Sequence, residues 1–109
     1  MPSERRLERI NEVIRRVVGQ SILELGNLPP TTLITITKVS LSDKMESVDV
    51  YFSVFPDKDI QRAEAFLKRE RIEFQSRINE ALKARRTPRI RFILDDSVAK
   101  VEEMFSQGL

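Results

Sequence analysis

The chain has 109 residues, of which 40% are hydrophobic and 33% are charged, with 19 Lys and Arg against 17 Asp and Glu. This length and composition are those of an ordinary globular protein, so we expect a single domain over residues 1–109. The sequence contains neither Cys nor His. Their absence excludes disulfides, thiolate metal sites, a thiol nucleophile and the commonest general base.

Other classes of protein are disfavoured by what the chain lacks. No apolar run approaches the roughly 20 residues that span a bilayer, and the N-terminal run MPSERRLERI is charged, so we expect a cytoplasmic protein. The glycines at 19, 26 and 108 are too far apart for a phosphate-binding loop. Asp57, Asp59, Asp95 and Asp96 fall where helices are expected to begin, which favours capping over catalysis. We expect a monomeric, non-enzymatic protein without metal, cofactor, small-molecule substrate or membrane partner.

The first half of the chain predicts one helix and two strands. Residues 4–25 place apolar side chains at spacings of three and four, from Leu7 to Leu25, which indicates an amphipathic helix. Residues 31–41 are rich in β-branched types and predict a strand, with a change of phase near Thr37 and Lys38 that favours a bulge. Residues 48–55 alternate and predict a second strand. The short connection between the two strands favours an antiparallel hairpin.

The second half predicts two helices, a strand and a last helix. No Gly or Pro occurs from Asp57, the expected N-cap, to Thr87. The apolar rhythm weakens between Lys68 and Glu73, so we expect a kink there and two helices, 58–70 and 73–86. Pro88 ends the second of these. Residues 89–94 alternate as a third strand, and 96–107 form a last helix. The order α-β-β-α-α-β-α predicts an α+β fold with a three-stranded mixed sheet and helices packed on one face.

Positive charge is concentrated in residues 68–91. This window holds nine Lys and Arg and three Glu, a net charge of +6 in a chain whose total is +2. Arg85 and Arg86 can simply complement the helix dipole, and Arg89 and Arg91 can protect an edge strand. Nine positive charges exceed what those roles require, which favours contact with nucleic acid, chiefly its phosphates. A protein–protein adaptor with a basic face remains the alternative.

Three stretches resemble one known family. They are the arginine-led first helix with Arg5, Arg6, Arg9 and Ile10; the strand pair TITKVSLSDKMESVDVYFSVF; and residues 82–97 with Arg85, Pro88, Phe92, Asp95 and Ser97. Their order and spacing resemble the ribosome-binding factor A family, which has a KH-like fold of the second topological type. KH modules clamp RNA with a GXXG loop between paired helices. The chain has Glu70-Arg71-Ile72 where this family usually has Ala-x-Gly at the interhelix kink.

The resemblance implies a non-catalytic assembly factor. Such a factor binds the free 30S small ribosomal subunit and its 16S rRNA, assists late maturation and rRNA end processing, and is associated with growth in the cold. Another KH-like RNA-binding module is a further alternative. Arginines and one lysine of the basic window, supported by the first helix, are the expected RNA contacts. These residues are Arg69, Arg71, Arg77, Lys83, Arg85, Arg86, Arg89 and Arg91, with Arg5, Arg6 and Arg9.

Overall fold

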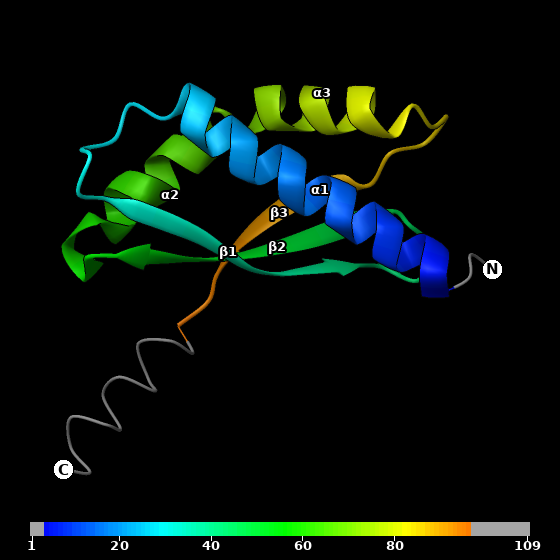
Figure 1. Cartoon of the computed structure of the whole chain (residues 1–109), viewed down its shortest axis with the longest axis horizontal. Coiled ribbons are helices and arrows are strands. Elements are labelled where there is room, and N and C mark those ends of the chain that lie inside the picture. The colour runs from blue at the N-terminus through cyan, green and yellow to red at the C-terminus, as the bar shows by residue number, and fades with distance from the viewer. Residues whose placement is uncertain (1–3, 97–109) are drawn as a thin grey trace, which may run out of the picture.

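The structure, a computed structural model, describes residues 4–96. In chain order these residues form α1 (Glu4–Leu25), β1 (Leu33–Leu41), β2 (Ser47–Phe55), a 3-10 turn η1 (Asp57–Asp59), α2 (Ile60–Arg69), α3 (Arg71–Leu82) and β3 (Arg89–Leu94). Figure 1 shows the three helices over one face of the sheet. The predicted KH-like α+β fold of the second type is confirmed over this range. The predicted helix 96–107 falls outside the described residues.

The sheet has the order β1-β2-β3, so that β2 lies in the middle. β1 pairs antiparallel with β2, and β3 pairs parallel with β2, which confirms the mixed sheet. The register of β1 and β2 shifts between Ile36 and Lys38, where the sequence predicts a bulge. Arg15 of α1 donates a hydrogen bond from Nη1 to the Ile36 carbonyl at 3.2 Å. The bulge therefore leaves a carbonyl that anchors the first helix to the sheet.

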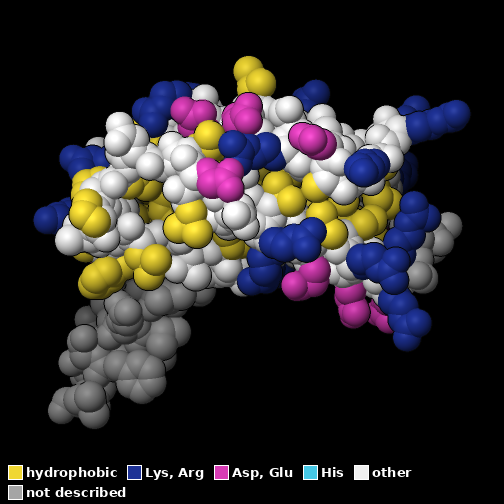
Figure 2. Space-filling view, turned by 45° about the horizontal axis from the view of Figure 1, so that its top comes forward, with side chains coloured by type: hydrophobic (Ala, Val, Ile, Leu, Met, Phe, Trp, Pro, Cys, Tyr) yellow, Lys and Arg dark blue, Asp and Glu magenta, His cyan; other side chains and the backbone are white. Residues whose placement is uncertain are grey.

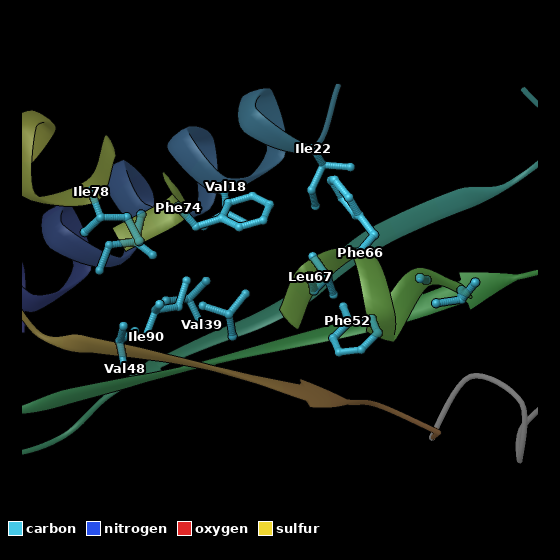
Figure 3. Packing of buried hydrophobic residues seen from close by; sticks show 14 residues of the cluster. Val18, Ile22, Val39, Val48, Phe52, Phe66, Leu67, Phe74, Ile78 and Ile90 are labelled. Carbon is cyan, nitrogen blue, oxygen red and sulfur yellow. The ribbon is translucent and has the colours of Figure 1, made fainter. Parts of the chain in front are cut away.

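The core lies between the helices and the inner face of the sheet. Val48, Val50, Phe52 and Val54 alternate along β2 and are buried, while the residues between them are half-buried. Four phenylalanines continue this core through edge-to-face contacts, with ring centroids 5.2–6.3 Å apart, in the order Phe66, Phe74, Phe92 and Phe52. Figure 3 shows the labelled side chains of the helices and of the strands gathered in one layer between them. This layer fixes how α2 and α3 sit over the sheet.

A break between α2 and α3 is confirmed within the predicted stretch. α2 ends at Arg69. Glu70 separates it from α3, and its backbone angles, φ of −94° and ψ of 11°, are not helical. The Glu70 N–H donates to the Phe66 carbonyl, and the Phe74 N–H donates to the Glu70 carbonyl, each at 3.0 Å. Because both bonds continue the helical pattern, the chain turns at one residue and needs no small residue there.

Two predicted helix ends were wrong. α3 ends at Leu82, four residues before the predicted end, because Lys83 takes a left-handed backbone with φ of 49°. Arg85 and Arg86 therefore lie in a loop. Asp57 does not cap a helix: it opens η1, and no side chain caps that turn. The carboxylate of Asp59 instead accepts a hydrogen bond from Thr32 at 2.7 Å, which ties η1 to the chain before β1.

Candidate nucleic-acid interface

Positive side chains from three separate segments meet at one end of the molecule. They come from the first turns of α1, from the hairpin between β1 and β2, and from the loop between α3 and β3. We call this surface the basic end and define it by Arg6, Arg9, Lys44, Arg85 and Arg86. Figure 2 shows dark blue side chains gathered at the right-hand end of the molecule around a yellow apolar patch. Such a concentration of cations attracts phosphate groups.

The fold explains why these distant segments meet. Lys83 ends α3 with its N–H donating to the Asn79 carbonyl at 3.0 Å, and the loop that follows returns toward β3 beside α1. The hairpin is held by Ser42, whose Oγ accepts hydrogen bonds from the N–H groups of Glu46 at 3.0 Å and Ser47 at 3.1 Å. Arg6 and Arg86, 80 positions apart, therefore line the same two hollows.

A second basic surface surrounds the turn between α2 and α3. Lys68 and Arg71 line a pocket of about 540 Å³ between α2 and the strands, whose apolar wall includes Phe52, Phe92 and Leu94. On the other side of the turn, Arg71 and Arg89 line a shallower hollow with residues of α3. We call Lys68, Arg69, Arg71 and Arg89 the helix-turn surface. Arg69 is exposed, pairs with Glu70 at 3.5 Å and lies over the Phe66 ring.

Arg77, a predicted contact residue, is engaged within the fold. Its guanidinium pairs with Glu24 of α1 at 2.5 Å and with Glu73 at 3.1 Å, and its side chain is 29% exposed. The hydrogen bond to Glu24 raises the pKa of Arg77. Two hydrogen bonds lower the pKa of Glu24: the larger effect comes from Arg77 and the smaller from Gln20. The arrangement joins α1 to α3, so Arg77 is oriented by carboxylates rather than presented toward solvent.

Arg91 lies on the sheet face that the helices leave open. It pairs with Asp49 of β2 at 2.7 Å, its neighbour in the parallel register. This hydrogen bond to Asp49 raises the pKa of the Arg91 guanidinium. The structure therefore brings Arg6, Arg9, Arg85 and Arg86 together and places Arg91 apart from them. Arg5 and Lys83 are exposed, and each lies within two residues of a member of the basic end along the chain.

Two residues of these surfaces were not predicted from the sequence. Lys44 belongs to the basic end, but it stands alone in the hairpin and no charge run marks it. Gln75 binds the edge of β3: its Nε2 donates to the Pro88 carbonyl at 3.0 Å, and its Oε1 accepts from the Ile90 N–H at 2.9 Å. A glutamine in a helix gives no signal that its amide will pair with a strand 15 residues away.

Residues 4–96 form neither a metal-binding cluster nor a membrane-spanning helix. Within this range, no cluster of three or more acidic side chains could hold a metal ion. No helix in the same range is both long enough and apolar enough to cross a membrane.

The order α-β-β-α-α-β, with two helices meeting at a single turn on one face of a mixed sheet, defines the KH-like class of the second type. The basic end and the helix-turn surface give this fold two positively charged surfaces. The comparison with known families is more specific. Residues 6–107 match the model of ribosome-binding factor A, and the chain belongs to that family. Its members are non-catalytic ribosome assembly factors.

Individual relatives agree with this assignment. Ribosome-binding factor A of Coprothermobacter proteolyticus is 32% identical over 95 residues, covering 87% of this chain and 69% of the relative. The crystal structure of ribosome-binding factor A from Thermus thermophilus shares the fold, with a TM-score of 0.64 and 24% identity. The match covers 80% of this chain and 92% of the T. thermophilus chain. A homology model of the T. thermophilus protein has been fitted into the cryo-EM map of its complex with 30S. It matches with a TM-score of 0.60 and 24% identity, over 77% of this chain and 89% of the T. thermophilus chain.

Proposed function

We propose that this protein is an assembly factor that binds the free small ribosomal subunit through 16S rRNA. The family membership over residues 6–107 carries the proposal. A T. thermophilus relative has been placed in a complex with 30S, which supports the same partner here. On this proposal the protein works in the cytoplasm during late maturation of the subunit and assists the processing of the rRNA ends.

The contact surface that we propose begins at the basic end. Its arginines come from α1 and from the loop after α3, which the fold places side by side, so they can meet several phosphates at once. The helix-turn surface extends the contact across the molecule. From the predicted set we assign direct contact with RNA to Arg5, Arg6, Arg9, Lys83, Arg85 and Arg86, and to Arg69, Arg71 and Arg89. Arg77 and Arg91 act by holding neighbouring elements through their carboxylate partners.

The mechanism follows from binding without chemistry. A protein that binds one conformation of the maturing RNA more tightly than another shifts the population toward the first. The binding energy would come from phosphate contacts that position the protein, and the folded shape of the RNA would supply selectivity. This action requires neither a nucleophile nor a metal ion.

Co-sedimentation with isolated ribosomal subunits tests the proposal. We expect the protein to pellet with small subunits and not with large ones. If the protein makes five phosphate contacts to single-stranded RNA, raising the salt concentration from about 50 to about 200 mM should weaken binding about a hundredfold. Absence of binding to small subunits at the lower salt concentration, or equal binding to large subunits, would contradict the proposal.

A further inference from the structure

An apolar pocket opens within the basic end. It has a volume of about 370 Å³ and lies between α1, the hairpin and the end of α3. Ile10, Val13, Met45 and Leu82 supply apolar walls, and arginines stand at its border. We propose that this pocket holds one unstacked base of single-stranded RNA, with the adjoining phosphates against those arginines. The inference rests on the proposed function and adds the class of RNA that the basic end selects.

The apolar walls are the reason to assign a base as well as a phosphate. Contact with phosphates alone requires only positive charge on an exposed surface. Here Arg6, Arg9 and Arg86 border four apolar side chains, an arrangement that matches a nucleotide with its flat apolar ring and its charged backbone. Guanidinium planes also stack on unstacked bases in RNA recognition.

The size of the pocket favours single-stranded RNA. A volume of about 370 Å³ lies near the lower end of the range for small-molecule sites. A splayed base can enter such a pocket, whereas a base held in a duplex is paired and stacked and cannot. A neighbouring hollow shares Arg6, Met45, Ala84 and Arg86 with the pocket and continues past Lys44. The backbone of a bound strand therefore has a basic path out of the pocket.

The pocket is formed before any ligand arrives. Met45 takes a left-handed backbone with φ of 57°, and its N–H donates to the Ser42 carbonyl at 2.9 Å. Lys83, next to the lining residue Leu82, takes the same conformation. The hairpin turn and the end of α3 thus already hold the lining residues in place. Little conformational entropy of the protein is therefore lost when a base binds.

Filling the pocket without changing its charge tests the inference. Ala81 lies exposed on α3 and lines the pocket, so Ala81→Leu adds bulk there and keeps a good helix former. Thr35→Leu is the matched control, because Thr35 is an exposed residue of β1 that lines a pocket beside η1, outside both basic surfaces. Ala84→Leu, in the loop, fills the same pocket from another wall and serves if the Ala81 variant does not fold.

Affinity would be measured by fluorescence anisotropy with a single-stranded RNA and with a duplex of the same sequence. We expect Ala81→Leu to weaken single-strand binding about tenfold, the effect of losing one stacked base, and to leave duplex binding unchanged. The Thr35→Leu control should bind both RNAs as the parent does.

The results separate this inference from the proposed function. Unchanged single-strand binding by a folded Ala81→Leu or Ala84→Leu variant would overturn the base pocket, and so would an equal loss for duplex RNA. A loss confined to Thr35→Leu would also overturn it, by moving the base to the pocket beside η1. A parent that binds neither RNA nor small subunits would overturn both proposals, whereas a parent that binds small subunits leaves the proposed function intact.

Discussion

Gln75 shows how one side chain can hold an edge of the sheet. β3 pairs with β2 on one side only, so its outer backbone groups need other partners. The amide of Gln75 meets two of them, the Pro88 carbonyl and the Ile90 N–H. Ile90 is fully buried, so water cannot replace the lost partner easily.

Replacing Gln75 by Ala should therefore destabilise the fold. The variant leaves a buried N–H and a carbonyl without their partner, which costs about 1–3 kcal/mol. Urea unfolding would measure the difference in the free energy of unfolding. Ser76→Ala, at the exposed neighbouring position, is the control and should change stability by less than about 0.5 kcal/mol. Equal stability of the two variants would show that the Gln75 contacts add nothing.

The packing of α1 against α3 includes an ion pair that responds to pH. Hydrogen bonds from Arg77 and Gln20 lower the pKa of Glu24 in the folded protein. A carboxyl group whose pKa is lower when folded adds stability above its ordinary pKa. That stability is lost as the pH falls through the folded pKa. The contact between the two helices should therefore weaken in acid.

Arg77→Gln tests this contact between elements. In the variant we expect the pKa of Glu24, followed by NMR titration of its carboxyl group, to rise toward its ordinary value. The stability difference between parent and variant should be larger at neutral pH than at a pH below the titration of Glu24, because protonation removes the pair from the parent too. Arg62→Gln, at an exposed position on α2, is the control. A Glu24 pKa that does not move in Arg77→Gln would contradict the assignment.

Most helices and strands could be predicted from the sequence, because the apolar periods of residues 4–25, 48–55 and 89–94 are unbroken. The bulge near Lys38 and the break near Glu70 were also visible as changes of rhythm. The end of α3 was missed because Lys83 adopts a left-handed conformation that glycine usually signals. Asp57 looked like a helix cap, but the chain forms η1 there, and Asp59 pairs with Thr32.

For the whole molecule, the sequence located the positive charge but not its grouping. The window from Lys68 to Arg91 divides among surfaces: Arg85 and Arg86 belong to the basic end, while Arg91 lies on the open sheet face. The contribution of Arg6 and Arg9 depends on tertiary contacts between segments about 80 positions apart. The role of Arg77 depends on Glu24, 53 positions away, and no local pattern reveals such a partner.

The central claim is that the basic end contacts the small subunit and that binding depends on it. Its most direct test compares two double charge reversals by co-sedimentation with isolated small subunits at low salt. Arg85→Glu/Arg86→Glu changes the basic end, and Lys58→Glu/Arg62→Glu changes exposed residues of η1 and α2 by the same formal charge. We expect the first variant to lose binding and the second to retain it. Binding retained by the first variant, or lost equally by both, would contradict the claim.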